Sequence, residues 1–466
     1  MPLTLPGNDA IREILVQRID HQKQAVGIVA GVIDADGRRV IAHGHLAAAD
    51  PNKADSRPLD DDTVFEIGSV TKVFTALLLA DMANRHEVSL EDAASKYLPA
   101  HVRMPEHNGK SITLLDLATH TSGLPRLPTN LKPKNPRNPY ADYTVDNLYE
   151  FLSTYELPRD PGSEFEYSNL GGGLLGHILA LRAGTDYETL IRTRITGPLN
   201  MPDTGIALSP SMQQRMATGH TAMLNPTPNW DLPTLAGAGA LRSSANDMLT
   251  FLEAFLRARE SDADSPLAAA MKTMLEVRRP MAQTPSAQTP ASPAKGETGL
   301  GWIILSPHGR EIAAHDGGTG GFRSWIGYDP SNRTGVVVLS NAATTIGGFD
   351  IGMHLLDRQW PLAKIEPPQQ RTEIQIDPQL LDHYTGRYQM APELVFEVTR
   401  DASHLFGQTH APAVSGPKFQ LFAETAKKFF AKVSNSQITF ETAPTGSATS
   451  LTLHKAGRDI PAPRLS

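Results

Sequence analysis

A serine and a lysine three residues apart form the first group in this chain that could do chemistry. Ser69-Val-Thr-Lys72 follows the apolar run 64–68 and opens a mostly apolar segment that reaches Met82. If this segment is a helix, residues three apart share a face, and the Lys72 amine lies beside the Ser69 hydroxyl. Burial disfavours the charged ammonium, and a neutral amine can help to deprotonate a serine nucleophile. The alternative is a helix-capping serine with a lysine that reaches to solvent.

Two further Ser-x-x-Lys patterns occur, one at Ser292 and Lys295 and one at Ser415 and Lys418. The first lies in a Pro-rich segment, and the second stands between predicted strands beside a proline. Neither serine is held on a rigid element, so Ser69 is the predicted nucleophile.

A tyrosine and an asparagine form the second group, Tyr167-Ser168-Asn169, which is the only Tyr-x-Asn in the chain. A phenol oxygen both accepts and donates protons, so Tyr167 could relay a proton near Ser69. The Asn169 amide could hold a substrate carbonyl. The alternative is a core tyrosine followed by a serine or asparagine that caps a helix.

The third group, His315-Asp316-Gly317-Gly318, ends a predicted strand. Glycine at a strand end lets another backbone approach closely, and a histidine there could orient a carboxylate or carbonyl. The alternative is a turn that needs glycine for conformational reasons only. A second His-x-Gly at His107 falls in a polar segment between the first two groups and is discounted.

The elements that would position these groups suggest an α+β fold. Residues 26–34 and 38–46 are predicted to be two strands that flank a turn at 35–37, after a short helix at 9–22. The chain then favours helices to about residue 275, and residues 278–298, rich in Pro, Ala, Ser and Thr, predict an exposed loop. Late strands return in four runs separated by turn signals. We expect the early and late strands to share one antiparallel sheet, with the helical middle inserted as a subdomain. The four late runs are GWIILS, REIAAHDG, FRSWIGYD and TGVVVLSN.

The length of 466 residues favours more than one domain. We predict a catalytic domain at 1–365, a linker at 366–376 and a small antiparallel β domain at 377–466. The last unit is expected because several runs after residue 377, such as LVFEVTRD and QITFET, alternate strongly.

The composition excludes several classes of protein. A net charge of −7 gives no basic footprint for nucleic acid, and the absence of cysteine excludes thiol catalysis, thiolate metal sites and disulfides. No run of about 20 apolar residues predicts a membrane span. The start MPLTLPGNDA lacks the pattern of a signal peptide, so we expect a cytoplasmic protein, or a periplasmic or secreted one whose leader has been removed. No cofactor or metal is expected, and the oligomeric state is left open.

The order of the three groups resembles the penicillin-binding-protein and class C β-lactamase superfamily. Further similar stretches are Leu117-Ala-Thr-His-Thr-Ser-Gly-Leu-Pro125, Gly299-Leu-Gly-Trp302 and the run from His315 to Phe322. The resemblance covers residues 8–360 and implies a β-lactamase/transpeptidase-like fold. The final unit resembles the lipocalin-like β-barrels that follow this domain in some relatives, with Tyr384-Thr-Gly-Arg-Tyr388 as its clearest feature.

The resemblance implies a serine hydrolase that forms an acyl-enzyme on a small ester, amide or peptide substrate. Ser69 would be the nucleophile, Lys72 and Tyr167 would share acid and base work, and Asn169 would contact the acyl-side amide. Backbone N–H groups of Ser69 and Gly318 would form the oxyanion hole.

One departure bears on the substrate, because class C β-lactamases usually carry Lys-Thr-Gly where this chain has His315-Asp-Gly317. A neutral imidazole attracts a carboxylate less than an ammonium does, which favours the D,D-peptidase, D-aminopeptidase and esterase branch over efficient β-lactam hydrolysis.

Two other functions are alternatives to this one. An α/β-hydrolase or a zinc peptidase would need Gly-x-Ser-x-Gly or His-Glu-x-x-His, and both motifs are absent. A non-catalytic member that binds peptide or glycan in the same cleft is the remaining alternative, and the joint presence of Ser69, Lys72 and Tyr167 argues against it.

Overall fold

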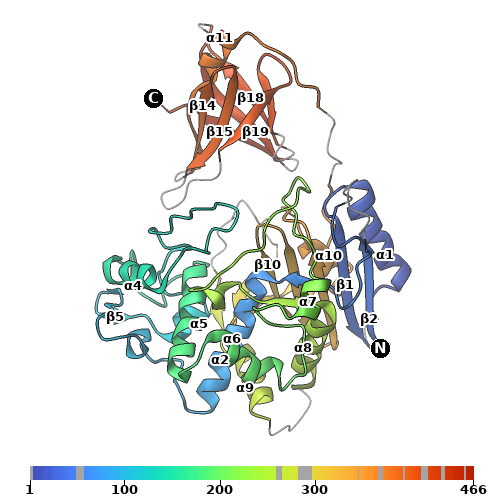
Figure 1. Ribbon diagram of the computed structural model, residues 1–466, viewed down its shortest axis with the longest axis vertical. Helices are drawn as coiled ribbons and strands as arrows, with labels where there is room; N and C mark the ends of the chain where they lie inside the picture. The colour runs from blue at the N-terminus through green and yellow to red at the C-terminus, as the bar shows by residue number, and fades with distance from the viewer. Residues whose placement is uncertain are drawn as a thin grey trace. The chain divides into compact units, whose positions relative to one another are not determined.

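The computed structural model describes residues 4–48, 57–258, 265–281, 296–344, 346–365, 371–391, 394–410, 418–431, 436–444, 446–455 and 458–465. The chain divides into two compact units, Met1–Ala363 and Lys364–Ser466 (Figure 1). Within the described ranges, no helix has both the length and the apolarity that crossing a bilayer requires.

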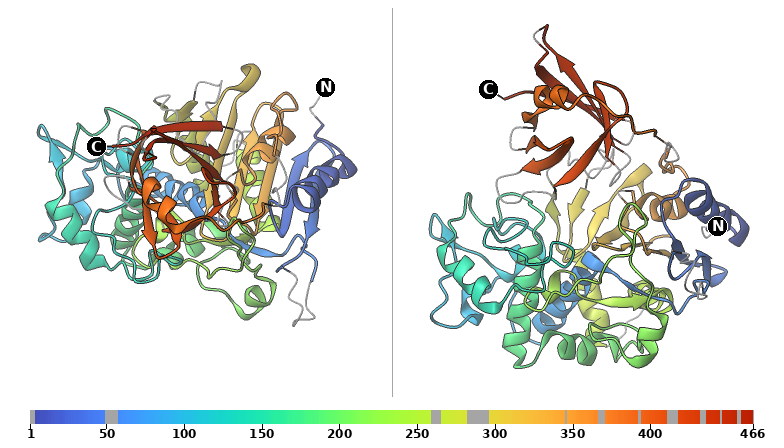
Figure 2. Two further views of the ribbon diagram at one scale, coloured as in Figure 1. Left: turned by 90° about the horizontal axis from the view of Figure 1, so that it is seen from above. Right: turned by 45° about the horizontal axis from the view of Figure 1, so that its top comes forward.

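An eight-stranded antiparallel sheet forms the centre of the first unit. Its strand order is β2-β1-β12-β11-β10-β9-β8-β7, so the N-terminal hairpin pairs directly with the last strand of the late meander. This hairpin, blue in Figures 1 and 2, lies beside β12 in every view. The strands are β1 (Gly27–Asp34), β2 (Gly37–Gly44), β7 (Arg279–Pro280), β8 (Gly296–Thr298), β9 (Ile303–Leu305), β10 (Ile312–Gly318), β11 (Arg323–Asp329) and β12 (Thr334–Ser340). The expectation that early and late strands share one sheet is confirmed.

The two faces of this sheet bury different layers of helices. Ile28, Ala30 and Val32 of β1 pack in one core with α1 and α10, and the intervening Val29 packs in a second core with α2 and α8. This alternation is what the period of two in a strand dictates when both faces are buried. The helices of this unit are α1 (Asn8–Val16), α2 (Thr71–Asn84), α3 (Leu114–Ala118), α4 (Val145–Thr154), α5 (Asn169–Ala183), α6 (Tyr187–Ile191), α7 (Pro210–Arg215), α8 (Ala245–Ala258), α9 (Pro266–Glu276) and α10 (Phe349–Leu356).

Short turns and two small ribbons complete the first unit. The ribbons are β3 (Val64–Glu66) with β6 (Arg242–Ser244), and β4 (Glu106–His107) with β5 (Lys110–Ser111). The single-turn helical segments are Gln17–His21, Gly68–Val70, Ala94–Tyr97, Arg192–Thr196, Ala236–Ala238 and Pro307–Gly309.

The structure refines one sequence prediction, corrects a second and supports a third. The helix expected to begin near Ser69 begins at Thr71, and Ser69 lies in the preceding 3-10 turn. The segment 278–298 is not a loop throughout, because its two ends form β7 and β8, which satisfy the free edge of β9 with backbone hydrogen bonds. Residues 282–295, which include Ser292 and Lys295, lie outside the described residues. His107 is part of the β4–β5 hairpin, where it contacts Asp160 at 2.5 Å, so its exclusion from the site is supported.

The second unit is a nearly closed antiparallel β-barrel of eight strands in sequential order. A bridge between Tyr388 and Arg464 links its first strand to its end. Tyr388, Phe429 and Phe440 lie in its buried core. The elements are β13 (Gly386–Ala391), β14 (Leu394–Asp401), β15 (His404–His410), β16 (Phe419–Ala423), β17 (Lys428–Ala431), β18 (Gln437–Thr442), β19 (Ala448–Lys455), β20 (Arg458–Pro463), the helix α11 (Pro378–Leu381) and the turn Asp382–Tyr384. The small β unit is therefore observed as a barrel, and its kinship to lipocalins stays a prediction. Residues 366–370 of the predicted linker and Ser415 lie outside the described residues.

Candidate active site

The turn that carries Ser69 is held between the ribbon β3–β6 and the central sheet. Ile67 donates its N–H to the Leu241 carbonyl (3.1 Å), and the Ser324 hydroxyl of β11 donates to the Ile67 carbonyl (2.7 Å). Gly68 then takes a left-handed conformation (φ 50°), which glycine adopts without the steric cost of a side chain. The chain turns sharply there and leaves Ser69 partly exposed, between the buried residues Gly68 and Val70.

The Lys72 amine makes three short contacts inside the protein. Its Nζ lies 3.0 Å from Ser69 Oγ, 2.9 Å from Asn169 Oδ1 and 2.7 Å from the Ala238 carbonyl oxygen. Burial, with a smaller contribution from the positive charge of Arg126, lowers the pKa of Lys72 well below its usual value. A neutral amine has two N–H donors and one lone pair, and Ala238 O and Asn169 Oδ1 can only accept. In the neutral form both donors would thereby be used, and the lone pair would face the Ser69 hydroxyl.

Helix α5 leaves room for the Lys72 side chain because the residue facing it is a glycine. A Cβ atom placed on Gly172 would lie 2.9 Å from Lys72 Cε and 3.2 Å from its Cδ. The glycine run after Tyr167-Ser168-Asn169 therefore has a packing reason, since a side chain here would displace the amine.

Ser168 caps α5 and fixes the residues on either side of it. Its hydroxyl accepts the Gly171 N–H (2.8 Å) and donates to the Pro125 carbonyl (2.7 Å). The helix-capping alternative for this tripeptide is thus correct for Ser168, and it is compatible with a chemical role for its neighbours. Because the cap is anchored at three points, Tyr167 and Asn169 are aimed at Lys72 by the backbone itself. The third anchor is the Ser168 N–H, which donates to His120 Nδ1 at 3.2 Å.

Tyr167 lies among the other site groups. Its ring centroid is 4.9 Å from Lys72 Nζ and 6.3 Å from the His315 ring centroid. Burial raises the pKa of Tyr167 above its usual range, and a hydrogen bond with Ser69 partly opposes this shift. The phenol therefore keeps its proton near neutral pH and is a proton donor there.

The glycines of β10 let this strand pack against the turn of Ser69. A Cβ atom on Gly68 would lie 2.6 Å from the Gly318 backbone nitrogen, and one on Gly317 would collide with the Ile67 carbonyl oxygen. The backbone that approaches β10 closely at Gly317 is therefore the protein's own turn at Ile67. This close approach brings the Gly318 backbone nitrogen close to Gly68, the residue before Ser69, which is where an oxyanion hole at Ser69 would need a donor.

His315 is buried and neutral. Burial lowers its pKa to about 4, although the nearby Asp316 charge opposes this shift. Its Nδ1 lies 2.6 Å from the Asp316 carbonyl oxygen, so Nδ1 carries the proton and donates it. Its Nε2 is then an acceptor, and it is buried with no partner among the residues described.

The structure therefore brings together Ser69, Lys72, Tyr167, Asn169 and the end of β10, which sequence reasoning named. It also shows three residues that sequence reasoning missed in this role. His120 lies against the Tyr167 ring at 4.3 Å, Tyr140 accepts from the Asn169 amide (3.2 Å), and Arg126 covers the Tyr167 ring at 5.1 Å. Of these three, only His120 lay in a stretch already noted for its resemblance, Leu117–Pro125.

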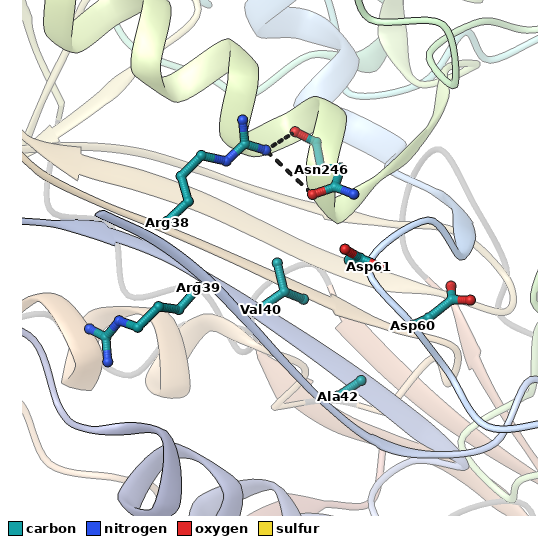
Figure 3. Close-up of a pocket in the computed structure, with 7 residues that line it drawn as sticks. All are labelled: Arg38, Arg39, Val40, Ala42, Asp60, Asp61 and Asn246. Carbon is teal, nitrogen blue, oxygen red and sulfur yellow. Dashed lines mark hydrogen bonds between the residues drawn. The ribbon is translucent and has the colours of Figure 1, made fainter. Parts of the chain in front are cut away.

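A surface hollow of about 400 Å³ lies elsewhere, on the edge strand β2 (Figure 3). Its Arg38 donates to the Asn246 carbonyl, and its Arg39 pairs with Asp34 at 2.5 Å. The hollow contains none of the residues named above, so it is separate from the candidate active site. No group of three or more His, Asp or Glu side chains suited to a metal occurs in the described part of the chain.

Comparison with protein families finds two matches. The model described as Beta-lactamase matches residues 13–355, and one described as "Domain of unknown function (DUF3471)" matches residues 370–462.

Individual relatives agree with the first match. The chain is 32% identical over 349 residues to the D-alanyl-D-alanine-carboxypeptidase/endopeptidase AmpH of Escherichia coli, covering 72% of this chain and 85% of that one. It is 25% identical to penicillin-binding protein 4* of Bacillus subtilis over 93% of this chain and 94% of the relative. A crystal structure of a beta-lactamase/D-alanine carboxypeptidase from Yersinia pestis superposes with a TM-score of 0.60 at 26% identity, over 72% of this chain and 93% of that one.

Proposed function

Because this chain belongs to the beta-lactamase family and is a serine hydrolase that works through an acyl-enzyme, we propose that Ser69 is the residue it acylates. One observation carries the assignment. The Lys72 amine lies 3.0 Å from the Ser69 hydroxyl and also contacts the acceptors Asn169 Oδ1 and Ala238 O, so that in its neutral form its lone pair is directed to Ser69.

In the proposed acylation, Lys72 takes the proton of Ser69 while Ser69 Oγ bonds to the substrate carbonyl carbon. The carbonyl oxygen becomes an oxyanion between the N–H groups of Ser69 and Gly318. Fixed donors of this kind stabilise charge as it develops and need no reorganisation during the step.

Tyr167 supplies the proton that the leaving group needs. Its raised pKa keeps the phenol protonated, so it can donate to the leaving nitrogen or oxygen as the carbonyl bond breaks. The Lys72 ammonium then returns its proton to Tyr167, whose ring lies 4.9 Å from the amine. A water molecule then attacks the acyl-enzyme carbonyl carbon, with Lys72 again taking the nucleophile's proton and Tyr167 again donating to the leaving oxygen. The leaving oxygen is now Ser69 Oγ, so Ser69 is regenerated.

For the substrate, we propose a peptide or ester with a D-alanyl acyl group, in preference to a β-lactam. The 32% identical relative is named a D-alanyl-D-alanine-carboxypeptidase/endopeptidase, which supports a D-alanyl peptide. The residue in place of the family's lysine, His315, is neutral because burial lowers its pKa to about 4. A neutral imidazole offers no ion pair to the carboxylate of a penicillin or cephalosporin.

Intact-mass measurement tests the nucleophile. After a short incubation with p-nitrophenyl acetate or a fluorescent penicillin, the wild-type chain should gain one acyl group. Ser69→Ala should gain none, and Lys72→Ala should acylate at least 10²-fold more slowly, the lower end of what a positioned base contributes. Thermal unfolding of both variants serves as the control for folding. A Ser69→Ala chain that is still acylated at the wild-type rate would refute the assignment.

A comparison of substrates tests the proposed class. D-Alanine release from an N-acylated D-alanyl-D-alanine peptide is measured beside nitrocefin hydrolysis at equal enzyme concentration. We expect a higher kcat/KM for the peptide. A higher value for nitrocefin would overturn the substrate class and leave the nucleophile assignment standing.

A further inference from the structure

The buried part of the candidate active site has little positive charge to offer a substrate. Burial lowers the pKa of both Lys72 and His315, and the Lys72 donors are already used by protein oxygens. An anionic group on a substrate therefore needs a cation elsewhere at the site.

Arg126 is such a cation, and both its backbone and its side chain are tied to the Tyr167-Ser168-Asn169 group. Its carbonyl oxygen accepts the N–H groups of Asn169 (3.0 Å) and Leu170 (3.3 Å) at the start of α5. Its guanidinium carbon lies 5.1 Å from the Tyr167 ring centroid. Arginine stacks readily on aromatic faces while its N–H groups remain free to donate at the edge.

The guanidinium of Arg126 is exposed and makes no hydrogen bond or ion pair with any residue that the structure describes. Arg323, at the start of β11 next to β10, differs in this respect. That guanidinium donates to the carbonyls of Thr319, Phe322, Ala343 and Thr344 and has a structural role. Arg126 keeps a planar set of five donors whose geometry matches a carboxylate.

The positive charge of Arg126 affects the pKa values of groups in the candidate active site. It is among the causes that lower the pKa of Lys72 and of His120, after burial in each case. The guanidinium is therefore close enough to the site for an anion bound to it to belong to the substrate undergoing reaction.

We propose that Arg126 binds a carboxylate on the acyl portion of the substrate and so selects anionic acyl donors. We assign the carboxylate to the acyl portion because the Arg126 carbonyl accepts a hydrogen bond from the N–H of Asn169, the residue expected to contact the acyl-side amide. The proposal deepens the proposed function and depends on it.

Two esters with the same leaving group test this selectivity. Mono-p-nitrophenyl glutarate carries a carboxylate at the end of a five-carbon acyl chain, and p-nitrophenyl pentanoate is its neutral counterpart. The measured quantity is the ratio of their kcat/KM values. Arg126→Ala should lower this ratio about 10- to 100-fold, as expected for a hydrogen-bonded charge pair near the surface. Arg126→Lys keeps the positive charge but loses the planar pair of N–H donors that matches a carboxylate, so it should give an intermediate ratio.

Two further measurements separate binding from a structural effect. The wild-type ratio should fall as salt is raised from 0.05 to about 0.5 M, because salt screens an exposed ion pair. Arg182→Ala, an exposed arginine at the C-terminal end of α5, is the matched control and should keep the wild-type ratio.

The outcomes are distinct. If the wild-type enzyme hydrolyses both esters and Arg126→Ala leaves the ratio within about twofold, the proposal is wrong and the proposed function stands. An equal loss for both esters in Arg126→Ala would show that Arg126 only positions Tyr167, which also overturns the proposal. If neither ester acylates the wild-type chain, the proposed function itself fails.

Discussion

Replacing Gly172 by alanine should inactivate the enzyme without unfolding it. Gly172 lies in the first turn of α5, where its Cα faces the Lys72 side chain. The alanine Cβ would lie 2.9 Å from Lys72 Cε and 3.2 Å from Lys72 Cδ. Carbon atoms in contact prefer about 3.5–4.0 Å, so the lysine must retreat by roughly 0.6–1 Å.

The size of the loss follows from what this retreat does to the amine. Lys72 Nζ reaches Ser69, Asn169 and Ala238 at 2.7–3.0 Å, and a shift of this size lengthens at least one of these contacts beyond hydrogen-bonding range. A misplacement of about 1 Å costs on the order of 10²-fold in rate, or about 2.7 kcal/mol of transition-state stabilisation. Alanine in a helix interior is favoured over glycine by about 1 kcal/mol, which offsets part of the packing cost in the folded state.

The neighbouring glycine provides a matched control. The three atoms nearest to a Cβ atom on Gly171 belong to Ser168 and Ser122, at 3.3–3.7 Å, and not to Lys72, so Gly171→Ala should keep activity within about threefold of wild type. The burst of p-nitrophenol from p-nitrophenyl acetate gives the acylation rate, and thermal unfolding gives the stability of each variant. If Gly172→Ala acylates as fast as Gly171→Ala, Lys72 is not the base that this geometry indicates.

Two pH measurements complete the predictions. The acylation rate depends on neutral Lys72, whose pKa lies well below its usual 10.5, so the rate should rise with pH through that lowered pKa and level off before pH 10. A rate that climbs steadily past pH 10 would show a normal lysine. Burial raises the pKa of Asp247 to about 6 from its usual 3.8, so its contribution to stability is fully present below about pH 4 and is lost as pH rises through about 6, a change of about 3 kcal/mol. Relative to wild type, Asp247→Asn should therefore gain stability between pH 4 and 7 in denaturant titrations, and a pH-independent difference would contradict this.

Sequence reasoning worked well for features that neighbouring residues determine. The two strand-like runs at 26–34 and 38–46 and the turn signal between them predicted the hairpin β1–β2, because strand propensity and turn chemistry are local. It was wrong about 278–298, where a Pro- and Ser-rich composition suggested a loop while the ends pair as β7 and β8. Edge pairing depends on which strand is left open, and composition does not report this.

The sequence by itself determined which chemical groups this protein has and in what order they occur. Serine, lysine, tyrosine and histidine of the site can each be read from short patterns. Tertiary structure alone decided their state. Lys72 meets Asn169 and Ala238 from 97 and 166 residues away, and the segment around Ala238 carried no motif. Likewise, Arg126 became notable only because no described acidic side chain reaches it, whereas Arg323 donates to four backbone carbonyls. The physical reason is that burial and electrostatic fields sum over all neighbours in space, and these neighbours come from distant parts of the chain.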